Sequence, residues 1–240
     1  MSNIYVVGDI HGYWTFLNSF INRKRPDIIL QCGDFGYWPK FDSTDLICEN
    51  PLSRNQDPWN FFGIKCQDTK IYFCDGNHED HWELKKFKIP TIIYDNIWYM
   101  PRASVLVLPD DRNVLFMGGA QSIDAYCRTI GFDWFPEEVI NYQDFLKLDN
   151  IFEMFVDKID IVISHTCPLE FFENGFNKKF LITDKMKDPS CIVLSRILEK
   201  FNPSLWYFGH FHESAEGKYN DTRWFAMNQA NHSGWYRKLL

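Results

Sequence analysis

The sequence lacks the features that mark secreted, membrane-spanning or cysteine-stapled proteins. It contains seven cysteines, which are scattered and form no C-x-x-C pair. No apolar stretch reaches the length of a membrane span, and the start shows neither a basic segment nor a long apolar run. We therefore expect reduced thiols, no zinc site built from cysteines, no membrane partner and a cytoplasmic location.

The chain also has no run of basic residues. Its formal net charge is −7 at pH 7, which disfavours long nucleic acids as partners. This count omits bound divalent metals, which would add local positive charge. The sequence itself indicates no oligomeric state.

Apolar and aromatic residues are abundant. They make up 45% and 18% of the 240 residues, enough for a well-packed core. No internal repeat, low-complexity tract or linker divides the chain. We therefore predict a single domain over residues 1–240.

Two apolar runs that end in Gly-Asp predict strands joined by a helix. The runs lie at residues 4–7 and 28–31, and residues 14–24 between them place apolar side chains on one helical face. A βαβ unit makes its two strands parallel neighbours, so Asp9 and Asp34 should lie at one edge of the sheet. Open α/β sheets bind their ligands at that edge.

The remaining elements follow from similar patterns. Short turns separate the runs between residues 97 and 117, which favours antiparallel or mixed pairing there. Prolines and polar residues make 37–67 an irregular excursion with one short helix near 57–62, and 166–187 is expected to be loop-like. Further strands are predicted at 71–74, 97–100, 105–108, 114–117, 159–163, 205–208 and around 224–226, and helices at 136–148 and 188–201.

Side chains that commonly bind metals follow five of these strands. Residues two apart, as in Asp9 and His11, point the same way in an extended chain and can converge. Taken singly, an Asp or Asn after a strand could instead cap a helix or form a turn. The whole set suits two transition metals that share a carboxylate; it comprises Asp9, His11, Asp34, Asn77, His78, His165, His210 and His212.

In their order along the chain, these segments resemble the motif blocks of the calcineurin-like metallophosphoesterase family. The resemblance extends from Gly8 to His212. It implies an α/β fold with two packed mixed β-sheets flanked by helices, a four-layer αββα sandwich. The matching segments are Gly8-Asp9-Ile10-His11-Gly12, Gly33-Asp34, Gly76-Asn77-His78-Glu79, Ser164-His165 and Gly209-His210-Phe211-His212.

The resemblance also implies a site and a reaction. Asp34 would bridge two ions of Mn, Fe or Zn, a hydroxide between the ions would attack phosphorus, and His78 would be the acid near the leaving group. The expected function is therefore hydrolysis of P–O bonds. By motif, one ion would be held by Asp9, His11, Asp34 and His212, and the other by Asp34, Asn77, His165 and His210.

One motif departs from the family pattern. Protein serine/threonine phosphatases of this family carry G-D-x-x-D-R-G at the second block, whereas Tyr37 and Trp38 replace the second acid and the arginine here. This change puts protein phosphatase activity in doubt and leaves open what orients His78. Aromatic residues suggest a phosphodiester or nucleotide-type substrate. The alternatives are a phosphomonoesterase or protein phosphatase, a nuclease, and a catalytically idle binding scaffold.

Several nearby residues have two possible roles. Tyr37 and Trp38 could stack on a flat substrate group or pack in the core. Arg128 could contact a substrate phosphate or form a surface salt bridge. His81 could face the site or be an exposed helical residue. The two glycines that open the segment 118–124 could allow close approach to a ligand, or only a tight turn.

Overall fold

The computed structural model describes residues 2–39, 63–154, 158–173, 175–176 and 188–240. The short helix predicted near 57–62 lies outside these residues, as do most of the predicted excursion and much of the loop predicted at 166–187. Among the described residues, no helix is both long enough and apolar enough to cross a membrane.

The first β-sheet contains both strands of the predicted βαβ unit. Ile4 pairs with Ile28 in parallel register, which confirms that the two strands are neighbours. The sheet has six strands in the order β12–β1–β2–β3–β5–β4. Their bounds are β1 (Ile4–Val7), β2 (Ile28–Gln31), β3 (Lys70–Phe73), β4 (Thr91–Tyr94), β5 (Ile97–Tyr99) and β12 (Tyr236–Lys238).

The second sheet is built in the same way, with parallel strands inside and antiparallel strands at both edges. Its order is β10–β11–β9–β8–β7–β6, and β6 and β10 are the antiparallel edges. The bounds are β6 (Ser104–Val107), β7 (Asn113–Met117), β8 (Ile161–Ser164), β9 (Leu205–Phe208), β10 (Ala215–Tyr219) and β11 (Thr222–Ala226).

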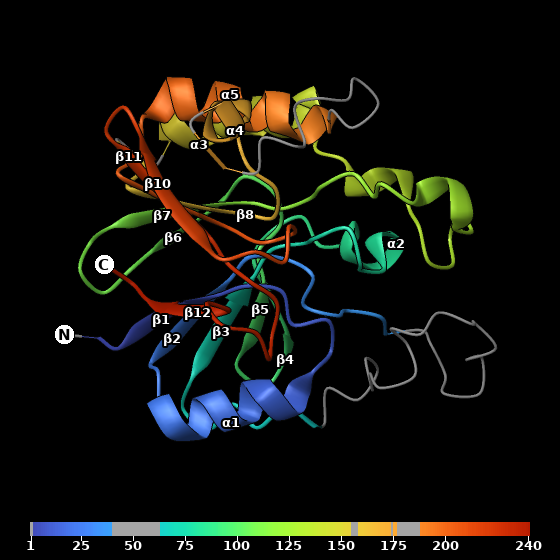
Figure 1. Ribbon diagram of the computed structural model, residues 1–240, viewed down its shortest axis with the longest axis vertical. Coiled ribbons are helices and arrows are strands. Elements are labelled where there is room, and N and C mark those ends of the chain that lie inside the picture. Colours follow the sequence, from blue (N-terminus) through green and yellow to red (C-terminus); the bar gives the residue numbers. More distant parts are fainter. Residues whose placement is uncertain (1, 40–62, 155–157, 174, 177–187) are drawn as a thin grey trace.

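Helices cover the outer faces of the two sheets (Figure 1). Helix α1 (Trp14–Lys24) packs on the first sheet, and α3 (Tyr142–Met154), α4 (Leu169–Glu173) and α5 (Pro189–Phe201) lie over the second. A third apolar cluster, which includes residues of β1, β7 and β9, fills the space between the sheets. This arrangement confirms the predicted four-layer αββα sandwich. The short helix α2 (His81–Leu84) lies beyond one end of the sheets.

The helix predicted at 136–148 begins later than expected. Residues Pro136–Glu138 form only a 3₁₀ turn, and Val139 has an extended backbone that ends it. Helix α3 then starts at Tyr142, where the Asn141 side chain accepts hydrogen bonds from the backbone N–H groups of Gln143 and Asp144. Asn141 therefore provides the N-cap, six residues nearer the middle of the predicted segment than its start at Pro136 would require.

Three strands and one α-helix among the described residues were not predicted. Strands β4, β10 and β12 are edge strands, and α4 lies inside the segment expected to be a loop. An edge strand buries one face or less, so its sequence carries a weak pattern. In β10, for example, no residue is fully buried.

A buried arginine connects the two sheets behind the metal-ligand candidates. Arg102 donates to the Asp75 carboxylate through Nε (2.9 Å) and Nη2 (2.7 Å) and to Asp144 through Nη1 (3.1 Å). It also donates to the backbone carbonyls of Val139, Glu137 and Glu138. Asp75 follows β3 of the first sheet, whereas Asp144 lies on α3 over the second, so Arg102 joins the two halves.

Candidate metal centre

Parallel strands of both sheets end at one place, and the predicted ligands follow those ends. β1 leads to Asp9 and His11, and β2 leads to Asp34. The other donors follow β3, β8 and β9. The structure brings all seven predicted metal ligands together, as the distances below show.

The first group of donors consists of Asp9, His11, Asp34 and His212. One donor atom from each lies within 4.8 Å of the others. His212 Nε2 is 3.1 Å from Asp9 Oδ2 and 3.0 Å from His11 Nε2. His11 Nε2 is in turn 3.7 Å from Asp34 Oδ2.

The second group consists of Asp34, Asn77, His165 and His210. His165 Nε2 is 3.3 Å from Asp34 Oδ2 and 3.0 Å from Asn77 Oδ1. His210 Nδ1 is also 3.0 Å from Asn77 Oδ1. The Asp34 carboxylate therefore belongs to both groups.

These distances fit a pair of metal ions. Metal–nitrogen and metal–oxygen bonds of about 2.0–2.2 Å place neighbouring ligands on one ion about 3–3.5 Å apart. The separations of 3.0–3.3 Å in the two groups match that spacing. A mixed set of carboxylate, amide oxygen and imidazole suits borderline transition metals rather than calcium or magnesium.

Hydrogen bonds hold the ligands in these positions. The Nδ1–H of His165 donates to the Cys32 carbonyl at 2.8 Å, which directs Nε2 at the site. The backbone N–H of His210 donates to both oxygens of Asp9 at 3.1 Å. The backbone N–H of His78 donates to Asp34 Oδ1 at 2.8 Å. The donors are thus oriented by the protein itself.

The convergence does not arise from extended chain, so that part of the prediction was wrong. His11, His210 and His212 have φ values of 49°, 69° and 49°, in the left-handed region. Asp34 is also left-handed, with φ 53°. Sharp turns after the strands, rather than alternation along a strand, direct these side chains inward.

Two glycines leave room for the carboxylates. A Cβ on Gly76 would lie 2.1 Å from Asp34 Oδ1, and one on Gly209 would lie 2.0 Å from Asp9 Oδ1. Both contacts are far below van der Waals distance. The motif glycines are therefore needed for close approach to the ligand oxygens.

The site keeps the carboxylates of Asp34 and Asp9 ionised. Burial alone would raise the pKa of Asp34, but the imidazoles of His165, His78 and His11 hold it well below the ordinary value. The pKa of Asp9 is also lowered, because His212 and His165 outweigh its burial. Conversely, Asp34 and Asp9 outweigh burial at His165 and raise its pKa to about 10. The two ionised carboxylates give the site negative charge, which favours the binding of cations.

His78 lies beside the first group and is contacted by Arg128. Its ring is 5.4 Å from the His11 ring, and Arg128 Nη1 is 3.1 Å from His78 Nδ1. Burial lowers the pKa of His78 to about 4, with Asp34 opposing and Arg128 adding to the effect. The imidazole is therefore neutral at neutral pH, and it can accept a hydrogen bond from Arg128.

The other predicted contact residues have different surroundings. Tyr37 is buried in the apolar cluster under α1, and the Trp38 ring packs 5.9 Å from the Phe135 ring. His81 is buried rather than exposed on its helix, which corrects the exposed alternative. Its Nδ1 lies 4.0 Å from Asp75 Oδ2, so it adjoins the Arg102 network.

Three buried polar residues near the site were not predicted to take part in it. Glu79 accepts backbone N–H groups from Gly36 and Gly76, and so connects the loops after β2 and β3. Ser122 and Glu138 form a chain of hydrogen bonds to Asn77. Glu138 lies at the start of the helix predicted at 136–148, where the structure forms a 3₁₀ turn. The Gly118–Gly119 pair lies shortly before Ser122 and was the sequence signal that pointed to this segment.

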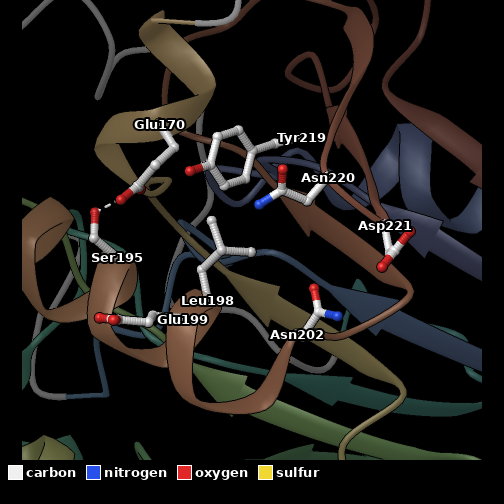
Figure 2. Close-up of a pocket in the computed structure, with 8 residues that line it drawn as sticks. All are labelled: Glu170, Ser195, Leu198, Glu199, Asn202, Tyr219, Asn220 and Asp221. Carbon is white, nitrogen blue, oxygen red and sulfur yellow. Dashed lines mark hydrogen bonds between the residues drawn. The ribbon is translucent and has the colours of Figure 1, made fainter.

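A hollow of about 920 Å³ lies elsewhere, between α4, α5 and the turn after β10 (Figure 2). Three carboxylic acids line it, Glu170, Glu199 and Asp221, and Glu170 accepts a hydrogen bond from Ser195 at 2.7 Å. None of the predicted metal ligands lines this hollow. We assign it no part in the metal centre.

Comparisons with known proteins bear on the family and the fold. A family model described as calcineurin-like phosphoesterase matches residues 2–214. A lariat debranching enzyme from Gallus gallus is 25% identical over 207 residues, which are 80% of this chain and 38% of that protein. The chain therefore spans less than half the length of this relative.

A solved structure resembles the fold. It is a candidate 5′-nucleotidase from Staphylococcus aureus in complex with α-ketoglutarate. The two share 18% identity at a TM-score of 0.50, over 95% of this chain and 48% of that chain. At this identity the likeness concerns the fold alone.

Proposed function

The chain belongs to the calcineurin-like phosphoesterase family, and from that premise we propose that it is a dinuclear metal-dependent hydrolase of phosphodiesters or nucleotide-type esters. The observation that supports this proposal most strongly is the shared position of Asp34. Its carboxylate lies 3.7 Å from His11 Nε2 in one donor group and 3.3 Å from His165 Nε2 in the other. A carboxylate between two donor groups is what two ions with a common ligand require.

The ions and the side chains of the protein are proposed to have different chemical roles. Two bound ions, of Mn, Fe or Zn, would supply Lewis acidity and an activated water. Asp34 and Asp9 contribute negative charge that holds the ions. His210 would contribute a nitrogen lone pair, His165 would do so once a metal displaces its Nε2 proton, and Asn77 would contribute an amide oxygen.

His78 and Arg128 are proposed to act together on the leaving group. Arg128 is itself fixed by Asp124, which accepts from Nε and Nη2 at 2.8 Å each. Its Nη1 also donates to the Asp133 carbonyl at 3.1 Å. A neutral His78 that accepts from Arg128 has one N–H left to donate to the leaving oxygen. Arg128 would thus orient His78, which the second motif block leaves without an acid because Tyr37 replaces it.

The charge near His78 favours a diester over a monoester. A phosphomonoester carries about two negative charges near neutral pH, by analogy with other phosphate groups of second pKa about 6, whereas a diester carries one. The positive charge of Arg128 is already paired with Asp124, so it offers little additional attraction for a dianion. The chicken relative is a lariat debranching enzyme, which is a reason to include a branched nucleic acid among the substrates tested.

A substrate panel tests this function. The purified chain would be assayed with Mn, Fe, Zn and Ni on p-nitrophenyl phosphate, bis-p-nitrophenyl phosphate, single nucleic-acid strands and a branched nucleic acid. We expect metal-dependent hydrolysis with the diester as the better substrate. A better monoester substrate would contradict the diester proposal, and two tightly bound ions without any turnover would favour a binding scaffold.

Replacing His78 should slow hydrolysis in a way that depends on the leaving group. General acid catalysis contributes about 10²–10⁴ in rate, and a neutral N–H donor should lie at the lower end, so we expect His78→Gln to lower kcat about 10²-fold on an alkyl ester. The effect should be much smaller on a p-nitrophenyl ester, because p-nitrophenolate leaves without a proton. Steady-state kinetics on both esters provide the measurement.

His232→Gln is the matched control, since His232 lies on the surface with only Gln229 as its side-chain partner. It should leave both rates unchanged. Equal losses on the two esters in His78→Gln would show that His78 does not assist the leaving group.

A further inference from the structure

Asn77 must present its oxygen, not its nitrogen, to the second ion, and the sequence of the motif alone does not ensure this. The two ends of an amide side chain have nearly the same shape but opposite hydrogen-bonding roles. A reversed amide would direct N–H groups at His165 and His210, and an amide nitrogen carrying hydrogens does not bind a cation. Some feature of the protein must therefore fix the orientation of this side chain.

A buried chain of two side chains runs from the far end of that amide. Asn77 Nδ2 donates to Ser122 Oγ at 3.0 Å, and Ser122 Oγ donates to Glu138 Oε2 at 2.8 Å. The backbone N–H of Ser122 donates to Glu138 Oε1 at 2.5 Å. The exposed fractions of Asn77, Ser122 and Glu138 are only 4%, 4% and 0%, so water does not compete for these groups.

The direction of every bond in this chain follows from its last member. An ionised carboxylate only accepts hydrogen bonds, so the hydroxyl of Ser122 must donate to Glu138. The free lone pairs of Ser122 Oγ then require a donor, which is the NH₂ group of Asn77. The oxygen of Asn77 is left to face His165 Nε2 and His210 Nδ1, both at 3.0 Å.

This direction holds while Glu138 is ionised. Burial raises the pKa of Glu138 to about 7, although hydrogen bonds from Ser122 oppose the shift. A proton on Oε2 would donate to Ser122 Oγ and reverse that bond, so the chain fixes the Asn77 amide only in the ionised form of Glu138.

The segment that carries Ser122 is anchored just before that residue. The Gly119 N–H donates to the Asp75 carbonyl at 2.8 Å, and the Gln121 N–H donates to Asp188 Oδ2 at 3.0 Å. Asp188 is also the N-cap of α5. Ser122 is therefore held in place independently of the hydrogen bond that it makes to Asn77.

We propose that Ser122 and Glu138 are positioning residues that set the amide orientation of Asn77 and thereby the affinity of the second metal position. Neither touches the reacting atoms. This proposal rests on the proposed function only because it requires a second ion. It gives a role to the segment after β7, which none of the motif blocks covers.

The test is metal binding rather than turnover. Apo protein would be titrated with Mn²⁺ by calorimetry for the wild type, Ser122→Ala and Glu138→Leu. Loss of an outer-shell partner commonly lowers metal affinity about 10- to 100-fold, so one of the two sites should weaken by that factor in both variants. The other site, which does not include Asn77, should keep its affinity.

Conservative variants and a control separate orientation from general damage. Ser122→Thr keeps the hydroxyl and should retain most of the affinity, whereas Glu138→Gln keeps only one of the two acceptor oxygens and should retain less. Ser190→Ala is the control, because Ser190 is equally buried and its Oγ accepts from the Ile140 N–H without contacting a ligand. It should leave both sites unchanged.

The outcomes distinguish this inference from the proposed function. A folded Ser122→Ala protein that binds two ions like the wild type, or losses as large in Ser190→Ala, would overturn the role of Ser122. If Ser122→Ala does not fold, as judged by circular dichroism, Glu138→Leu and its Gln counterpart decide the question. Wild-type protein that binds two ions yet hydrolyses no phosphoester would defeat the proposed function and leave the titration result standing.

Discussion

Asp34→Asn should abolish nearly all hydrolysis and weaken both metal positions at once. The substitution keeps the size of the side chain but removes the charge that lies between His11 and His165. Bound metals supply several kcal/mol of transition-state stabilisation, and each 1.4 kcal/mol or so is tenfold in rate, so a loss of about 4 kcal/mol would lower kcat/KM about 10³-fold. Kinetics on bis-p-nitrophenyl phosphate and Mn²⁺ titration of apo protein measure the two effects.

The substitution should not strain the backbone at position 34. Asp34 has φ 53°, and asparagine tolerates the left-handed region as well as aspartate does. Asp111→Asn is the matched control, because Asp111 has φ 65° and lies on the surface. It should behave as the wild type. Two ions bound with unchanged affinity in Asp34→Asn would show that Asp34 is not their common ligand.

Arg102→Ala should destabilise the fold far more than an ordinary surface arginine substitution. It leaves the carboxylates of Asp75 and Asp144 without their shared partner in a buried setting, where both acids are at most 9% exposed. Removing one member of a buried ion pair costs about 3–5 kcal/mol. Urea unfolding of the apo protein measures the loss.

Arg112→Ala is the comparison variant. Arg112 also contacts an aspartate through two nitrogens, but its partner Asp110 is half exposed. Exposed pairs contribute about 0–1 kcal/mol, so the control should lose little. Equal losses in the two variants would contradict the role of Arg102 in joining the sheets.

The ion pair between Arg102 and Asp144 also predicts that the stability of the fold falls at acidic pH. Burial alone would raise the pKa of Asp144, but Arg102 and Lys147 lower it below its ordinary value. A lowered folded-state pKa gives stability that is complete above the unfolded value of about 4 and is lost as the pH falls through the folded value. The wild type should therefore lose more stability below pH about 4 than Arg102→Ala does.

Much of the fold and of the candidate site could be predicted because the signals were local. β1, α1 and β2 each have a continuous apolar pattern, and their order alone makes the strands parallel. Parallel strands end at a common edge, so any ligand that directly follows a strand is brought near the others. The common edge placed Asp9 beside Asp34, whereas the resemblance to the family grouped Asp34 with His165, which follows a strand of the other sheet.

What could not be predicted depends on contacts between distant segments. The burial of His81 arises from packing of its ring against Phe135, and the orientation of Asn77 arises from Ser122 and Glu138. The late start of α3 depends on the cap formed by Asn141. The edge strand β10 buries too little to leave a clear alternation in its sequence.

The most direct test of the account is anomalous X-ray scattering from crystals of the full chain grown with Mn²⁺. The account predicts two anomalous peaks about 3.5–4 Å apart, as in other two-metal sites, with an oxygen of Asp34 bound to each ion. Asn77, His165 and His210 should surround one peak. A single peak, no peak at saturating metal, or two peaks that share no carboxylate would contradict it.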